Sequence, residues 1–148
     1  MDHFLIYFKN YWDAMKGPYA LVNEWGTKTT RFHQIVKPRD TLWVIIQAGP
    51  SAPDEWRLLQ KIQIESLYRD PANEYSYRAR GDEKASSIFD PKVQSDLVPL
   101  LKRLNFASGK KIELSGRKIA KALQFIRKLC EEDTALLSKY ATSLARIS

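Results

Sequence analysis

The sequence is poor in the residues that build disulfides and metal sites. Its 148 residues include one cysteine, Cys130, and two histidines, His3 and His33. A single cysteine cannot form an internal disulfide. Without a Cys-x-x-C pair, two histidines are also too few for a structural zinc site. We therefore expect no metal ion and no cofactor.

Sequence motifs of common catalytic chemistry are missing as well. The chain has no G-x-S-x-G elbow, no Walker loop and no H-E-x-x-H. His33 could act as the base for a Cys130 nucleophile, but Cys130 falls on the apolar face of a predicted helix. Asp40, in "KPRD", has the position of a turn residue that accepts hydrogen bonds from nearby backbone N–H groups. These features disfavour an enzyme.

Long hydrophobic runs are also absent. No stretch approaches the roughly 18 apolar residues of a membrane-spanning helix. The N-terminal "MDHFLIYFKN" has Asp2 where a signal peptide has Lys or Arg. We therefore expect a cytoplasmic protein that does not bind membranes. An apolar content of 44% with 28% charged residues suits a globular chain, and 148 residues suit a single domain, 1–148.

Positive charge is concentrated in the last third of the chain. Residues 1–101 contain 13 Lys and Arg and 13 Asp and Glu, whereas residues 102–148 contain 11 and 4. The net charge of +7 therefore belongs to the C-terminal third. Such asymmetry is typical of proteins that bind nucleic acid or another acidic partner. A solvated, lysine-rich face with no partner is the alternative.

The predicted elements are strands with short helices between them, followed by helices. Apolar runs and alternations predict strands at residues 4–8, 19–25, 41–49, 55–68 and 75–80. Helical spacing and capping residues predict helices at 27–37, 95–106, 115–130 and 131–147. Pro99 makes the helix within 95–106 short or late to begin. This order predicts an α+β fold with a small curved sheet or barrel.

The two C-terminal helices are expected to pack as a hairpin, because the connection between them is short. At 100° per residue, Arg117, Lys121 and Lys128 fall on one face of the 115–130 helix, opposite its apolar face. The pattern therefore predicts a basic face on this helix.

Large aromatic residues are concentrated before residue 78. All four Trp and six of the seven Tyr lie there. Trp43, inside the most apolar run, suits a core. Trp12 and Trp25 stand beside polar residues at the ends of short elements, where binding residues often lie. A flat ring at such a place can stack on a base, and Gly26 allows another surface to approach the backbone closely.

The order of these features over residues 3–80 resembles the PUA-like superfamily, especially its EVE and YTH branches. The resemblance rests on "FLIYF", the loop "KNYWDAM", the Trp-Gly-Thr of "NEWGTKT", the turn "KPRD" with "TLWVII", and the strand "EWRLLQKIQI". It implies a small curved barrel, of about residues 1–92, that holds an extruded modified base in an aromatic cage. Residues 93–148 would be a helical extension packed on it.

The resemblance also implies particular site residues. The base pocket would comprise Asn10, Tyr11, Trp12, Trp25, Gly26 and Thr27, with a second wall from Trp56, Tyr68, Tyr75 or Tyr77. Phosphate contacts on a basic surface would come from Arg78, Arg80, Arg117, Lys121 and Lys128. The expected partner is DNA or RNA, and the expected role is that of a non-catalytic reader.

Two alternatives remain open at this stage. In one, the C-terminal helices bind a partner protein and the aromatic residues belong to the core. In the other, the chain is an RNA-acting enzyme similar to ASCH domains, which are PUA-like relatives, although no acid–base pair stands out.

Overall fold

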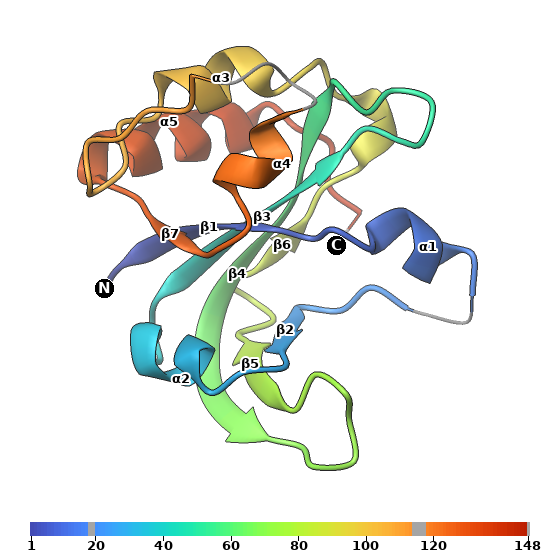
Figure 1. Cartoon of the computed structure of the whole chain (residues 1–148), viewed down its shortest axis with the longest axis vertical. Helices are drawn as coiled ribbons and strands as arrows, with labels where there is room; N and C mark the ends of the chain where they lie inside the picture. The colour runs from blue at the N-terminus through green and yellow to red at the C-terminus, as the bar shows by residue number, and fades with distance from the viewer. Residues whose placement is uncertain (18–19, 114–117, 148) are drawn as a thin grey trace.

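A computed structural model describes residues 1–17, 20–113 and 118–147. Strands and helices alternate through the first half, and most of the helical residues of the second half lie in two helices, α3 and α5 (Figure 1). The elements in chain order are β1 (His3–Tyr7), α1 (Tyr11–Met15), β2 (Glu24–Thr27), α2 (Arg31–Ile35), β3 (Thr41–Gln47), β4 (Trp56–Arg69), β5 (Tyr77–Gly81), β6 (Ser87–Ile88), the 3-10 turn η1 (Pro91–Val93), α3 (Val98–Arg103), α4 (Ile119–Ala122), β7 (Arg127–Lys128) and α5 (Glu131–Thr142).

The strands form one mixed sheet of seven, in the order β2-β5-β4-β3-β1-β7, with β6 pairing with β4. β1 and β3 are parallel, and the other pairs are antiparallel. Figure 1 shows that the long β4 curves strongly along its length. Within the described residues the end strands β2 and β7 do not pair with each other, so the sheet is open. The α+β prediction is confirmed with a small curved sheet, which is not closed into a barrel within the described residues.

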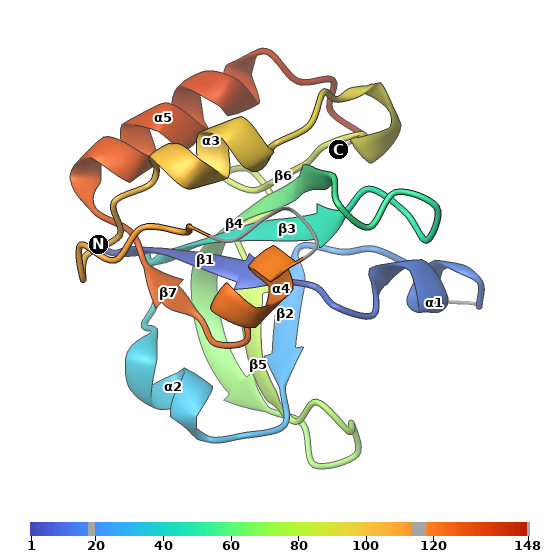
Figure 2. The same ribbon diagram turned by 45° about the horizontal axis from the view of Figure 1, so that its top comes forward.

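Both faces of the sheet are buried, because its central strands are apolar on both sides. Along β3, Trp43 and Ile45 point to one core, whereas Leu42, Val44 and Ile46 point to the other. The first core is covered by α3, α4 and α5, and the second by α1 and α2 (Figure 2). The second core ends at the short edge strand β2, and the candidate site lies there.

Several predicted elements are confirmed with shifted boundaries. The strands predicted at 4–8, 41–49, 55–68 and 75–80 correspond to β1, β3, β4 and β5. The strand predicted at 19–25 begins later, as β2, and Tyr19 lies outside the described residues. The helices predicted at 27–37 and 95–106 are the shorter α2 and α3, with Pro99 in the first turn of α3.

The helix predicted at 115–130 is wrong, and so is the hairpin that it would form with α5. Of the described residues 118–130, only Ile119–Ala122 are helical, and the chain then becomes extended as β7. Arg127 pairs with Leu5 in β1, and the N–H of Leu129 donates to the carbonyl of His3 at 2.8 Å. Without β7, the backbone groups of β1 on this edge would lack partners, and that requirement outweighs local helical spacing.

The second helix of the predicted hairpin, at 131–147, is confirmed as α5. Leu137 is fully buried, and Leu136, Tyr140 and Leu144 pack against the first core. Cys130 does not lie on a helical face but precedes α5 at its N-cap, where it is partly exposed. Among the helices of the described chain, none is long and apolar enough to cross a membrane.

Candidate functional site

A pocket of about 450 Å³ opens at the β2 edge of the sheet, and we call it pocket A. Its walls come from the end of β1, the start of α1, β2, the β4–β5 connection and β5. Four residues predicted for a base pocket line it together: Asn10, Trp25, Gly26 and Tyr75. Its volume lies within the range of about 300–1,000 Å³ that is common for small-molecule sites.

Trp25 forms the aromatic wall of pocket A. In the antiparallel pairing of β2 with β5 it stands opposite the buried Ala79, so its indole turns towards the second core. The ring of Phe8 packs edge-on against it, with the centroids 5.5 Å apart and the planes at 88°. Trp25 is only partly buried and also lines the pocket. Trp25 therefore packs on the second core and also lines the pocket, whereas stacking on a ligand stays a prediction.

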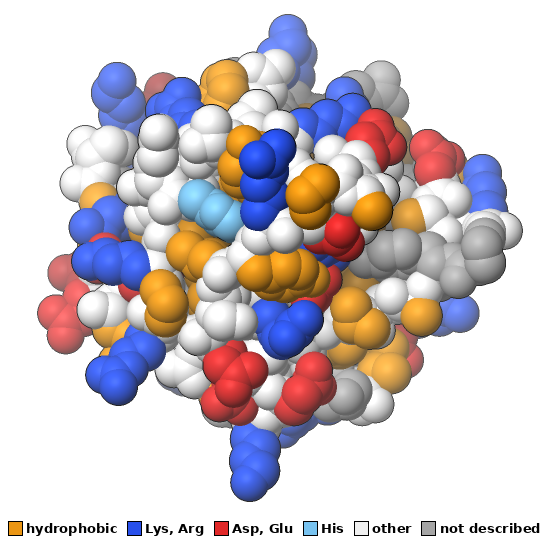
Figure 3. All heavy atoms as spheres, turned by 90° about the horizontal axis from the view of Figure 1, so that it is seen from below, with side chains coloured by type: hydrophobic (Ala, Val, Ile, Leu, Met, Phe, Trp, Pro, Cys, Tyr) orange, Lys and Arg blue, Asp and Glu red, His pale blue; other side chains and the backbone are white. Residues whose placement is uncertain are grey.

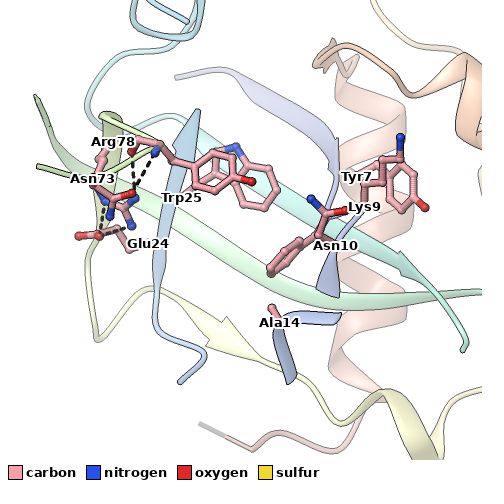
Figure 4. Close-up of a pocket in the computed structure, with 11 residues that line it drawn as sticks. Tyr7, Lys9, Asn10, Ala14, Glu24, Trp25, Asn73 and Arg78 are labelled. Atoms are coloured by element: carbon pink, nitrogen blue, oxygen red, sulfur yellow. Dashed lines mark hydrogen bonds and ion pairs between the residues drawn. The ribbon is translucent and has the colours of Figure 1, made fainter. Parts of the chain in front are cut away.

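An ion pair of Glu24 and Arg78 closes one end of the pocket (Figure 4). Arg78 Nη2 lies 2.6 Å from Glu24 Oε2, and the two side chains are only 15% and 17% exposed. Burial of the guanidinium opposes its charge, but its interactions with Glu24 and Tyr68 outweigh this and raise the pKa of Arg78. Arg78 also donates from Nη1 to the carbonyl of Tyr75 at 3.1 Å. The pair therefore ties the β4–β5 connection to β2.

Gly26 is required by this arrangement. A Cβ at this position would lie 2.4 Å from Arg78 Nη1 and 2.9 Å from the carbonyl oxygen of Tyr75. The groups that approach Gly26 closely are therefore the Arg78 side chain and Tyr75 of the chain itself, and the approach of a ligand to Gly26 stays a prediction.

Lys9 and Asn10 form the opposite end of the pocket. Figure 4 shows them well separated from Glu24, Asn73 and Arg78, with Trp25 between the two groups. Asn10 is the exposed N-cap residue of α1, and no hydrogen bond from its side chain caps the helix. An exposed amide can both donate to and accept from the edge of a planar ligand.

Three predicted cage residues are structural instead. Trp56 is completely buried in the first core, so it cannot touch a ligand. Tyr11 is 8% exposed and belongs to the second core. Trp12 is partly buried, and its indole N–H donates to the carbonyl of Gln47 at 2.8 Å. Trp12 and Tyr11 also pack edge-to-face, so the two residues anchor α1 to the sheet.

The remaining predicted aromatic residues lie near pocket A but do not line it. Tyr68 lies in β4, and its hydroxyl donates to Glu24 Oε1 at 2.8 Å. This hydrogen bond supports the ion pair of Glu24 with Arg78. Tyr77 packs edge-to-face with His33 and under the guanidinium of Arg69. Thr27 lines a neighbouring hollow, and its hydroxyl donates to the carbonyl of Thr29.

The predicted phosphate contacts do not form one surface. Arg78 is occupied by Glu24, whereas the Arg80 side chain is 59% exposed and lies over the ring of Tyr68. Lys121 is exposed in α4. Lys128 is in β7, where it lies 3.5 Å from the Asp2 carboxylate. The basic face predicted for Lys121 and Lys128 is therefore wrong, because these residues share no helix.

Arg117, the third residue of that face, lies outside the described residues. Three residues that line pocket A were not predicted from the sequence: Phe8, Glu24 and Asn73. Glu24 stands next to Trp25 in a predicted strand, but its ion pair depends on Arg78, which is 54 residues away in the sequence.

Pocket A offers a ligand an indole ring, two side-chain amides and an ion-paired carboxylate. The carboxylate of Glu24 is held by an arginine and a tyrosine, which leaves it poorly placed to act as a general base. No cluster of His, Cys, Asp and Glu that could hold a metal ion occurs among the described residues. No protein-family model matches the chain, and no curated protein is significantly similar to it.

Proposed function

We propose that this protein is a non-catalytic reader of nucleic acid, of PUA-like type, that binds an extruded, modified base in pocket A. The observation on which the proposal rests is a pocket of base-binding size with an indole wall and polar groups at both ends. Trp25 stacks on the base, while Asn10 and Asn73 contact its polar edges.

The energetics suit a modified base taken out of its stack. Extrusion costs a few kcal/mol, least for an unpaired base. Stacking on an aromatic side chain recovers about 1–3 kcal/mol per base. A methyl group on the base adds about 0.8 kcal/mol if the pocket buries it fully. The aromatic residues that line pocket A, Phe8, Trp25 and Tyr75, supply apolar surface for such a group.

The experiment compares two aromatic variants. Trp25→Ala removes the stacking wall, whereas Tyr140→Ala removes a partly buried ring of α5 that packs on the first core and lines neither pocket A nor its neighbouring hollow. Labelled oligonucleotides containing N6-methyladenine or 5-methylcytosine, and their unmodified counterparts, are titrated as single strands and as duplexes. Trp25→Ala should weaken the best complex about 5- to 150-fold. Tyr140→Ala should bind like the wild type.

The proposal fails if the wild type binds no oligonucleotide, or if a folded Trp25→Ala protein binds as tightly as the wild type. Circular dichroism and thermal unfolding of both variants separate loss of binding from loss of fold. Most of the apolar stripe predicted at 131–147 packs on the first core, which leaves the interaction-module alternative less apolar surface there for a partner protein.

A further inference from the structure

A second hollow adjoins pocket A, and we call it pocket B. It has a volume of about 320 Å³ and is lined by residues of β1, β2 and α2 and by the segment 123–126 between α4 and β7. Tyr7 and Trp25 line both pockets. The two hollows are therefore neighbours that share Tyr7 and Trp25 as lining residues.

The lining of pocket B combines positive charge with an exposed ring. Among the described residues that line it, the charged ones are Lys28 and Arg31, and none is acidic. The ring of Phe125 is 69% exposed, and the Arg31 guanidinium lies 5.8 Å from its centroid. Figure 3 shows hydrophobic side chains exposed among Lys, Arg, Asp and Glu on the lower face of the molecule in Figure 1, where α2 lies.

Lys28 is paired with Glu74, at 2.8 Å, but this pair is on the surface, with side chains 57% and 68% exposed. Exposed ion pairs are held weakly, so a phosphate group can replace the Glu74 carboxylate beside Lys28. A planar ring on Phe125 and an anion beside Lys28 and Arg31 together correspond to one nucleotide.

We propose that pocket B binds the nucleotide adjacent to the one in pocket A, so that the ligand is an unpaired strand rather than an intact duplex. This inference rests on the proposed function of pocket A. A single base flipped from a duplex leaves its neighbours stacked in the helix. Two adjoining pockets are filled together only when neighbouring bases are both free of the stack.

The test uses fluorescence anisotropy with the best-bound modified single strand, the same strand with an abasic site on either side of the modified base, and its duplex. The variants are Phe125→Ala and Arg31→Gln. Their matched controls are Val93→Ala, a similarly exposed apolar side chain that lines neither pocket, and Lys92→Gln, an exposed cation beside it.

Phe125→Ala should weaken binding of the intact single strand about 5- to 150-fold. An abasic neighbour on one side should weaken the wild type by a similar factor, and it should have no further effect on Phe125→Ala. Arg31→Gln should reduce the slope of log affinity against log salt by about 0.7, the value for one phosphate contact on a single strand. Val93→Ala should leave affinity unchanged, and Lys92→Gln should not change the slope.

The inference is overturned if Phe125→Ala binds like the wild type, if neither abasic site matters, or if the duplex binds as tightly as the single strand. When binding is lost in Trp25→Ala but unaffected in Phe125→Ala, pocket A stands as the site and pocket B does not. Failure of the wild type to bind any oligonucleotide removes both proposals.

Discussion

Glu24 and Arg78 are diagonal neighbours on one face of the β2–β5 pair, and their side chains meet at 2.6 Å at the end of pocket A. Arg80 stands directly opposite Glu24 in the register, and Arg80 Nε lies 3.7 Å from Glu24 Oε1. One carboxylate thus faces two guanidinium groups and the hydroxyl of Tyr68. This cluster therefore adds side-chain contacts to the backbone pairing that holds the short edge strand β2.

We expect Glu24→Gln to lower the free energy of unfolding by about 1–3 kcal/mol, because it leaves the mostly buried Arg78 without its anion. Adding Arg78→Gln should recover part of that loss. Urea unfolding of the two single variants and the double variant measures their coupling. Lys28→Gln, which breaks a surface pair, is the control and should cost far less. Strictly additive losses would contradict the importance of the pair.

Gly26→Ala should destabilise the protein by about 1–3 kcal/mol, as overpacking does in a filled interior. The added Cβ would meet the backbone oxygen of Tyr75, which cannot move without shifting the β4–β5 connection. Gly49→Ala is the matched control, because nothing lies within 4 Å of a Cβ built there. It should change stability by less than about 0.5 kcal/mol. Equal thermal shifts in the two variants would refute this account of Gly26.

Stability should fall as the pH drops below about 6.5, the ordinary pKa of histidine. Burial, together with the nearby Lys61, lowers the pKa of His3 in the folded state. Its Nδ1 accepts a hydrogen bond from the indole N–H of Trp43 at 3.1 Å, which requires that nitrogen to be unprotonated. As the pH falls, His3 therefore takes up a proton in the unfolded chain before it does so in the folded protein. The free energy of unfolding decreases until the pH is below the lowered pKa of His3.

His3→Asn keeps an acceptor for Trp43 but does not titrate in this range. Urea unfolding between pH 7.5 and pH 5 should show a weaker pH dependence in His3→Asn than in the wild type. Identical slopes for the two proteins would exclude His3 as the source.

Asp133 should be among the most sensitive charged positions. It is fully buried, and its carboxylate accepts hydrogen bonds from the backbone N–H groups of Asn105, Phe106 and Cys130 at 2.7–3.2 Å. Asp133→Ala leaves these donors without their acceptor, and we expect a loss of about 2–4 kcal/mol. Glu131→Gln, an exposed acidic residue in the same first turn of α5, is the control. Thermal unfolding that shifts equally in both would contradict this role.

The sequence anticipated the elements whose signal is local. The apolar runs at 41–49 and 55–68 predicted β3 and β4, because burial on the two faces of a sheet repeats with the side-chain alternation. The close approach at Gly26 and the turn role of Asp40 also followed from residue type. Asp40 accepts from the N–H of Lys37 at 3.0 Å, as "KPRD" indicated. Such features need only a few neighbouring residues to be recognised.

Features that depend on distant partners were missed or misplaced. The apolar residues at 115–130 have helical spacing, but part of this segment forms β7 instead. β7 supplies hydrogen-bond partners to the outer edge of β1. Trp56 and Trp25 both stand beside polar residues in the sequence, yet one is completely buried and the other lines two pockets. Local pattern cannot distinguish them, because burial depends on what packs above each ring.

By itself, the sequence determined an α+β chain with apolar central strands, a Trp-Gly pair able to admit a close neighbour, and excess positive charge in its last third. Only the tertiary structure decided that Trp25 is the indole wall of pocket A, that Arg78 neutralises Glu24, and that pocket B adjoins pocket A. The physical reason is chain distance. Glu24 and Arg78 are 54 residues apart, and only the pairing of β2 with β5 brings their side chains to one place.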